Sequence, residues 1–430
     1  MSVTLRNYPY PFTSALAFVT DIDTSTFQSL PYVHRCFYGA ESGYEGISLE
    51  LSNSFWLMNT QKTDGNVEKN NFIYTLKPNG KERPFVRRRL AKYFKTPLFD
   101  TMHTYGQFRN GMFKREHAEK CLEFAAQNDI HTKLWTYHGS RNQHQNIRPT
   151  DDSWTGDDPN SDAYHLDLLL QSGMRYFRVP PSLDLMTPGI RKTVMETRDG
   201  NKIQTYAGHG VLNTPDNFEE IETWIKGLES EGKLPYEYRR IFQPSERFPH
   251  KVLTWKVEML PFQLSEAVLS KLSDSGKSLF VNQHLTQHFS TYCFKNKKIQ
   301  DALRRLDKYQ KDGKILVSSP ARLLEFELIR DNLVYTSELK NNILHIDIVP
   351  KIETDALNFT LDEENVSGLA FHLPEDAQSC VVTLGGKAIN TVTEKEDNGK
   401  MLAYIPWRSL AAEQLGAVDA FASEFGEGNA

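Results

Sequence analysis

Short apolar segments rich in β-branched and aromatic residues alternate with helical segments from residue 14 to about residue 330. Strands separated by helices pair in parallel, because the helical crossover returns the chain to the same end of the sheet. About eight such units favour a (β/α) barrel of seven or eight strands, with an open doubly wound sheet as the alternative. No Gly-x-Gly-x-x-Gly or Walker A pattern follows the first strand, so a nucleotide-binding fold is not indicated. The strand-like segments are ALAFV, GISLEL, TPLFD, HTKLW, MRYFRV, VLTWKV, SLFVN and KILVS.

The pattern changes after residue 332. Short strand-like segments such as NILHIDIV, CVVTLGGKAI and MLAYIPW follow one another with polar turns and without a long amphipathic helix between them. This pattern is typical of a small all-β sandwich, which we expect over residues 333–408, after a barrel domain over residues 1–332. The stretch 409–430 is rich in Ala, Gly and Glu, and it favours a flexible tail with at most a short helix.

Composition excludes several classes of protein. The formal net charge of -5 and the pI near 6.3 argue against a broad nucleic-acid surface, which needs a basic excess. No apolar run is long enough to span a membrane, and the N-terminus lacks the pattern of a signal peptide. The cysteines are far apart and form no Cys-x-x-Cys pair, so we expect reduced thiols in a cytoplasmic protein and no zinc-finger site. They are Cys36, Cys121, Cys293 and Cys380.

Polar side chains, most of them titratable, come soon after five of the expected strands. In a (β/α) barrel the chemistry takes place at the C-terminal ends of the strands, and Asp and His serve there in metal ligation and proton transfer. Each residue taken alone has an ordinary structural explanation, such as a helix N-cap, a core histidine or a polar loop. Their occurrence at five strand ends favours a common site. The residues are Asp21, Asp23, Asp100, His103, His138, Arg141, Asn142, His144, Asn146, Arg178, His284 and His288.

The order of these motifs resembles the polysaccharide deacetylases, carbohydrate esterase family four of the glycoside hydrolase/deacetylase barrel superfamily. The stretch AFVTDIDTS stands where that family has Thr-Phe-Asp-Asp, with Asp21 and Asp23 one residue further apart. HTYGQ is similar to the family's His-(Ser/Thr)-x-x-His, except that Gln107 replaces the second histidine. LWTYHGSRNQHQN stands at the third strand end, LLQSGMRYFRV is similar to a later family segment, and SLFVNQHL matches the closing Leu-His motif through His284. The likeness covers about residues 14–330.

This resemblance implies a metal-dependent deacetylase, a hydrolase of the carbon–nitrogen or ester bonds of acetylated carbohydrate. Asp21 would be the general base and His284 the general acid. Asp23, His103 and a third ligand would hold a divalent metal, expected to be Zn²⁺.

One departure from the family pattern bears on the metal, and two of the strand ends bear on substrate binding. Gln107 is a doubtful zinc ligand, because a neutral amide oxygen suits harder ions. His138 or His144 could take its place, and we name His138 as the third ligand. The loop after the third strand would bind the sugar together with the end of the fourth strand, through Arg141, Asn142, His144 and Arg178.

Two other functions remain open at this point. A glycoside hydrolase on the same type of barrel would use Asp21 and Asp23 together with further acids near the rim. A non-catalytic glycan-binding or assembly protein that has lost its metal is favoured by Gln107. In all three cases the expected partner is a carbohydrate. The sequence leaves the role of the C-terminal β region undecided.

Overall fold

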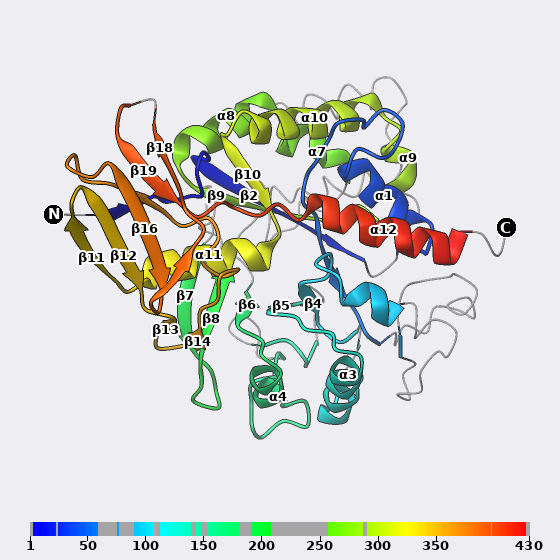
Figure 1. The fold of residues 1–430 in the computed structure, drawn as a ribbon. Coiled ribbons are helices and arrows are strands. Elements are labelled where there is room, and N and C mark those ends of the chain that lie inside the picture. Colours follow the sequence, from blue (N-terminus) through cyan, green and yellow to red (C-terminus); the bar gives the residue numbers. More distant parts are fainter. Residues whose placement is uncertain are drawn as a thin grey trace.

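The fold is described from a computed structural model of the 430-residue chain. One large sheet with helices packed on it forms most of the molecule, and smaller sheets lie at one side (Figure 1). Within the described residues no helix is both long and apolar enough to cross a membrane. The structure describes residues 3–22, 25–58, 75–76, 90–106, 108, 112–138, 143–147, 153–179, 191–207, 257–286, 290–396 and 398–426.

The large sheet has nine strands, and every pairing in it is parallel except that of β7 with β8. The expected α/β fold with a mostly parallel sheet is therefore confirmed. The expected segment VLTWKV lies outside the described residues, apart from its last residue. The strands are β2 (Ser14–Asp21), β3 (Ser52–Phe55), β4 (Thr101–His103), β5 (Leu134–Thr136), β6 (Tyr176–Arg178), β7 (Arg191–Glu196), β8 (Lys202–Ala207), β9 (Ser278–Gln283) and β10 (Ile315–Ser318).

Strand β2 organises the sheet because it pairs with three others. Residues 15–20 of β2 pair with β9, residues 14–17 with β10 and residues 19–21 with β3. Since β9 uses the same part of β2 as both other partners, it lies at one edge of β2, and β10 and β3 share the opposite edge. From β3 the order continues through β4, β5, β6 and β8 to β7. No pairing among the described strands joins β7 to β9, so closure into a barrel is not observed.

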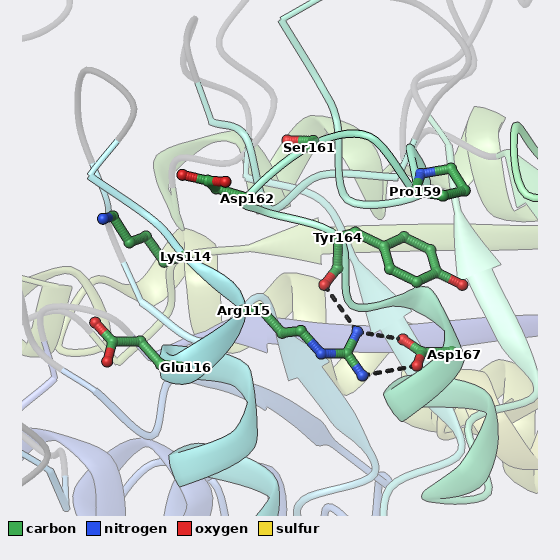
Figure 2. Close-up of a pocket in the computed structure, with 8 residues that line it drawn as sticks. All are labelled: Lys114, Arg115, Glu116, Pro159, Ser161, Asp162, Tyr164 and Asp167. Atoms are coloured by element: carbon green, nitrogen blue, oxygen red, sulfur yellow. Dashed lines mark hydrogen bonds and ion pairs between the residues drawn. The ribbon is translucent and has the colours of Figure 1, made fainter.

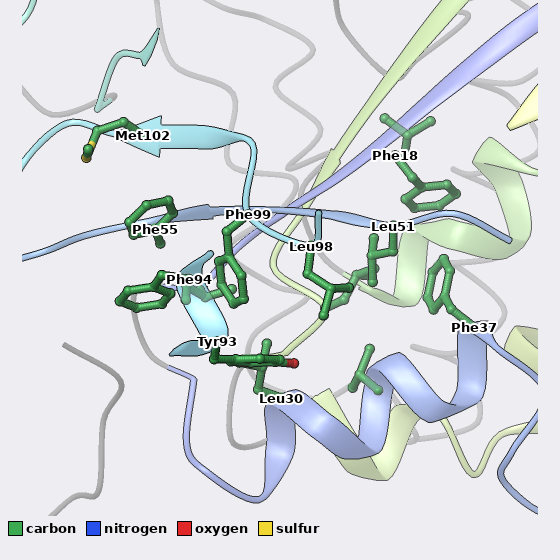
Figure 3. Close-up of a cluster of buried hydrophobic side chains, with 14 of the residues drawn as sticks. Phe18, Leu30, Phe37, Leu51, Phe55, Tyr93, Phe94, Leu98, Phe99 and Met102 are labelled. Carbon is green, nitrogen blue, oxygen red and sulfur yellow. The ribbon is translucent and has the colours of Figure 1, made fainter. Parts of the chain in front are cut away.

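Alternation along the strands gives the sheet two faces. The outer face packs under the helices into the main hydrophobic core, where Phe18, Phe55 and Met102 meet side chains such as Phe37 and Tyr93 (Figure 3). The inner face forms a second core, built from small residues of β2 and larger ones of other strands and closed by helix α11 (Pro320–Asn332). Its members include Ala15, Ala17, Val19, Leu134, Tyr176, Tyr206, Phe280, Leu316, Leu323, Leu324 and Leu328.

The helices follow from local signals in the sequence. Helix α10 buries Ile299, Leu303 and Leu306 from one stripe, the spacing of an amphipathic helix. Helix α8 starts where the Ser265 hydroxyl accepts a hydrogen bond from the Val268 amide, and it ends at Gly276 in the left-handed conformation. The helices not yet given are α1 (Ser29–Phe37), α3 (Arg115–Gln127), α4 (Leu166–Gln171), η1 (Val257–Met259), α7 (Leu260–Gln263), α8 (Glu266–Ser275), α9 (Ser290–Cys293), α10 (Lys297–Lys311) and α12 (Ala411–Gly426).

Helix α11 closes the end of the inner face where the parallel strands begin. Glu325 of this helix accepts hydrogen bonds from Lys133 (2.6 Å) and Arg175, which directly precede β5 and β6. Glu327 pairs with Lys192 (2.7 Å) and accepts a hydrogen bond from Ser278, the first residue of β9. The buried carboxylates Glu325 and Glu327 are thus matched by donors, three of them where the strands begin and one, Lys192, on β7 opposite Tyr206.

The C-terminal region consists of two four-stranded sheets around one core, together with a two-stranded hairpin. Leu344 and Ile346 of one sheet pack in the same cluster as Phe371 and Ala403 of the other, and Phe326 of α11 joins them. The N-terminal strand β1 pairs with β15, which the sequence did not indicate. The sheets are β11 (Tyr335–Lys340), β12 (Ile343–Ile348), β16 (Ser379–Leu384) and β17 (Lys387–Ile389); β1 (Thr4–Leu5), β15 (Ala370–His372), β19 (Met401–Tyr404) and β18 (Val392–Lys395); and the hairpin β13 (Lys351–Glu353) and β14 (Asn358–Thr360).

The end of the chain differs from the flexible tail expected over residues 409–430. Helix α12 lies beside α1 (Figure 1), and its Val418 and Phe421 are buried in the main core. The ring of Phe421 stacks on Tyr93 with centroids 4.0 Å apart. Gln414 is fully buried and accepts a hydrogen bond from the Tyr38 hydroxyl at 2.9 Å. The Ala-rich composition therefore belongs to a packed helix, because its few large apolar residues fall on one face.

We expect Phe421→Ala to lower the free energy of unfolding by about 3 kcal/mol, because it empties a buried aromatic site. Ala420→Ser, at an exposed position of the same helix, should change it by less than about 0.5 kcal/mol. Urea unfolding of both variants measures this. Equal stability of the Phe421→Ala variant and the wild type would mean that α12 does not pack on the core in solution.

Acid should destabilise the fold through His34. This side chain is fully buried between Asn53 (Nε2 to Oδ1, 2.9 Å) and the Tyr93 hydroxyl, and burial lowers its pKa to about 4. Between about pH 6.5 and pH 4 the unfolded chain binds a proton that the folded chain does not. Stability therefore falls as the pH drops through this window, by up to about 1.4 kcal/mol per pH unit from this residue. A His34→Gln variant should show a shallower dependence of unfolding free energy on pH, and an unchanged slope would contradict this assignment.

Candidate functional site

The inner face of the large sheet changes from apolar to polar at the C-terminal ends of its strands. Along β2 the inward positions carry Ala15, Ala17 and Val19, and then Asp21. The same alternation and register place polar side chains at the ends of the neighbouring strands. These are Ser54 on β3, His103 on β4, Thr136 on β5, Arg178 on β6 and Asn282 on β9.

The carboxylate of Asp21 is held from three sides. It is 4% exposed, and its Oδ1 accepts a hydrogen bond from the Ser54 hydroxyl. Its Oδ2 accepts one from Asn282 Nδ2 at 3.3 Å and lies 3.3 Å from His284 Nε2. Burial by itself would raise the pKa of Asp21, but His103, His284 and Ser54 together hold that pKa well below its usual range. Asp21 is therefore an oriented, ionised carboxylate at neutral pH.

The imidazole of His103 is buried and neutral. It is 6% exposed and stacks on the indole of Trp56, with ring centroids 5.7 Å apart and planes 7° from parallel. Burial lowers the pKa of His103 to about 4, although the Asp21 carboxylate opposes this shift. Its Nδ1 is buried and has no hydrogen-bond partner. A neutral imidazole with an unused nitrogen can bind a metal ion or a polar substrate group.

His138 follows β5 and lies beside this pair of rings. Its ring centroid is 5.2 Å from that of His103 and 5.5 Å from that of Trp56. The side chain of Asn146 fixes the His138 backbone: Oδ1 accepts a hydrogen bond from the His138 amide (3.1 Å) and Nδ2 donates one to its carbonyl (2.9 Å). Asn146 thus holds this loop against the strand end, and its amide is committed to the backbone.

A second group of polar side chains continues the row formed by His103. Thr136, Arg178 and Tyr206 are register partners on β5, β6 and β8, and Thr136 also pairs with His103 on β4. Each of the four residues carries a buried polar atom without a hydrogen-bond partner. The guanidinium of Arg178 lies 5.1 Å from the ring centroid of Phe280.

The structure brings together Asp21, His103, His138, Arg178 and His284 of the expected site residues. His144 lies in the same loop as Asn146, and its backbone oxygen accepts a hydrogen bond from the Thr155 amide (3.2 Å). Four of the expected residues, as well as His288, fall outside the described residues. The four are the metal ligand Asp23, the doubtful ligand Gln107, and the substrate-binding pair Arg141 and Asn142.

Several site residues were not found from the sequence. Ser54 lies on β3 and Trp56 directly follows this strand, whereas the sequence pattern placed the strand at GISLEL, residues 46–51. Asn282 lies at the end of an expected strand. The sequence pattern indicated a site role for His284, two residues further on, and not for Asn282. Thr136 and Tyr206 belong to the site only through the register of their strands, for which the sequence contains no local signal.

The described residues fit part of a metal site. Two imidazoles on one tetrahedral ion, with metal–nitrogen distances of about 2.0–2.1 Å, would have ring centroids about 5 Å apart. His103 and His138 match this spacing at 5.2 Å, and His103 Nδ1 lacks a partner. No group of three or more His, Cys, Asp or Glu side chains within the described residues is arranged to hold a metal ion. The two histidines could therefore supply two ligands, and the described residues provide no third.

A separate cavity of about 550 Å³ lies where α3 and α4 begin, and Lys114, Glu116 and Tyr164 are among its lining residues (Figure 2). Its arginine, Arg115, is already paired with both carboxylate oxygens of Asp167 (2.8 and 2.7 Å) and donates to the Tyr164 carbonyl (3.1 Å). The paired charges of this cavity contrast with the unpartnered polar atoms at the strand ends.

No protein-family model matches the chain, and neither the curated proteins nor the solved structures contain a match. Its function therefore has to be inferred from the arrangement of side chains at the strand ends.

Proposed function

We propose that this chain is a hydrolase that removes acetyl groups from carbohydrate, and that Asp21 and His284 carry out its proton transfers. One observation carries the proposal: Asp21 Oδ2 and His284 Nε2 lie 3.3 Å apart at the ends of the adjacent parallel strands β2 and β9. The C-terminal ends of parallel strands are where α/β enzymes place their chemistry. The order of the sequence motifs supports the same activity.

The two residues suit complementary roles. Asp21 is ionised, and hydrogen bonds from Ser54 and Asn282 fix its orientation, so it can take the proton of an attacking water. His284 is more exposed than Asp21 and can donate a proton to the departing amine or alkoxide. Its contact with the Asp21 carboxylate stabilises the protonated imidazole that this step requires.

His103 and His138 would hold a divalent metal in this proposal, with Asp23 as a further ligand. Because burial keeps His103 neutral, its lone pair is available at neutral pH. A divalent ion bound there would polarise the acetyl carbonyl and lower the pKa of a bound water. The stack on Trp56 and the Asn146 clamp on the His138 backbone hold the two ligands in place.

We also propose that the large sheet belongs to the (β/α)-barrel class and that the C-terminal sheets form a sandwich domain. Arg178 of β6 and Tyr206 of β8 both contact the ring of Phe280 on β9, at 5.1 and 5.6 Å. These strands are far from β9 in the pairing order, so this contact across the inner face supports strong curvature of the sheet. The two C-terminal sheets share a single core, as the layers of a sandwich do.

A glycoside hydrolase is less well supported. Such an enzyme needs two carboxyl groups about 5–9.5 Å apart at the cleaved bond. Among the described residues at the C-terminal ends of these strands, Asp21 is the only carboxylate in the cluster of His103, His284 and Arg178. A single base paired with an imidazole suits acyl transfer better than cleavage of a glycosidic bond.

The test is acetate release from a panel of N- and O-acetylated monosaccharides and oligosaccharides. We expect Asp21→Asn and His284→Gln to lower kcat by about 10²- to 10⁴-fold, because each removes one proton-transfer group. Asp376→Asn, at an exposed position of the C-terminal region, is the matched control and should leave the rate unchanged.

Two results would contradict the proposal: acetate release that survives in a folded Asp21→Asn variant, or release of reducing ends in place of acetate. The metal is tested separately by metal analysis of the wild type and His103→Ala. Loss of bound Zn²⁺ from the variant alone supports its assignment as a ligand, and equal metal content in both proteins opposes it.

A further inference from the structure

Arg178 is a buried cation for which the described part of the chain provides no anion. Its side chain lies at the end of β6 and is 6% exposed. The rings of Phe280 and Tyr137 flank its guanidinium, with centroids 5.1 and 5.6 Å from Cζ. No carboxylate of the described residues pairs with it, and its buried Nε lacks a hydrogen-bond partner. Asp21 is already held by other groups and does not form an ion pair with Arg178.

Two half-buried arginines in the described part of the chain, Arg322 and Arg115, are paired. Arg322 donates to both oxygens of Glu50 at 2.8 and 2.7 Å. Arg115 forms a two-point ion pair with Asp167, as Figure 2 shows. An unpaired buried charge is costly, and proteins keep one mainly where a ligand supplies the missing partner. Arg178 therefore indicates an anion that comes from outside the described part of the chain.

The neighbours of Arg178 lack partners as well. Thr136 and Tyr206 are its register partners on either side, and both hydroxyls are buried without a hydrogen bond. His103 extends the row by one more strand, and its Nδ1 is also unsatisfied. Buried polar atoms without partners are rare in native proteins, about a few per hundred residues. The three on the adjacent strands β5, β6 and β8 point to a single missing group, and that of His103 is the nitrogen proposed to bind the metal.

We propose that the row of Thr136, Arg178 and Tyr206 binds an oxyanion of the substrate, a carboxylate or a phosphate. The planar guanidinium can donate two parallel hydrogen bonds to two oxygens of such a group, and each flanking hydroxyl can donate one more. The two aromatic rings hold the guanidinium in place before the substrate arrives. This inference rests on the proposed function in one respect, namely that the bound anion belongs to the substrate. The substrate is then an acidic acetylated sugar.

The test is isothermal titration calorimetry of the full-length wild type with three sugars: glucuronate, glucose 1-phosphate and neutral glucose. We expect at least one acidic sugar to bind at least about tenfold more tightly than glucose, since charge-assisted hydrogen bonds are the strong ones. Tighter binding of glucuronate assigns a carboxylate, and tighter binding of glucose 1-phosphate assigns a phosphate.

The variants locate the anion. Arg178→Met should weaken binding of the preferred acidic sugar by about tenfold or more, whereas Arg115→Met, which removes a paired arginine, should leave it unchanged. Without ligand, Arg178→Met should melt at the same or a higher temperature than the wild type, because an unpaired buried charge has been removed. If this variant does not fold, Tyr206→Phe, which keeps the charge and removes one donor, should weaken binding several-fold.

Equal binding of acidic and neutral sugars by the wild type would overturn the proposal. Unchanged binding of the acidic sugar in the folded Arg178→Met variant, or in Tyr206→Phe when Arg178→Met does not fold, would also overturn it. Asp21→Asn separates the two proposals, since it should retain anion binding while it loses acetate release. Anion binding in a protein that never releases acetate would refute the hydrolase and leave the anion site standing.

Discussion

The pairing of β2 with three other strands is the constraint on which the rest of the structure depends. Its two edges carry β9 on one side and β10 and β3 on the other, so segments more than 200 residues apart in the sequence meet at one strand. This pairing brings Ser54, Asn282 and His284 to the Asp21 carboxylate. The small inward residues Ala15 and Ala17 leave room for the large side chains of other strands and of α11 in the inner core.

The two ends of the inner face differ in how fully their buried charged side chains are paired. At the end where the strands begin, Glu325 and Glu327 of α11 are matched by lysine, arginine and hydroxyl donors, which suits a structural role. At the opposite end Arg178 has no anion among the described residues, and each residue in its row has one buried side-chain polar atom without a hydrogen bond. A folded chain tolerates such a loss of stability where a ligand restores the missing contacts. The difference explains why the second end is the better candidate for function.

The sequence predicted the features that depend on local pattern. The alternation of strands and helices indicated a parallel sheet, and Asp21, His103 and His284 were identified because each comes within four residues of the end of an apolar segment. Features that depend on strand pairing were missed, because neighbouring strands and their register are not encoded in any one segment. Thr136 and Tyr206 belong to this group.

The strand expected at residues 46–51 is β3, which begins one residue after that segment. The apolar residues Leu49 and Leu51 suggested a strand, but they pack in the core just before the residues that pair. Helix α12 was missed because its composition is Ala-rich and has few large apolar residues. Those residues form a buried face only because α1 and the main core pack against them.

A crystal structure of the protein with a bound acidic acetylated sugar would test the proposed anion site and catalytic pair most directly. We predict that the acidic group lies within about 3 Å of the Arg178 guanidinium and the Tyr206 hydroxyl, with the acetyl group next to Asp21 and His284. A sugar bound elsewhere would contradict it, for example in the cavity beside Arg115. So would a sugar whose acidic group points to solvent while Arg178 stays unpaired.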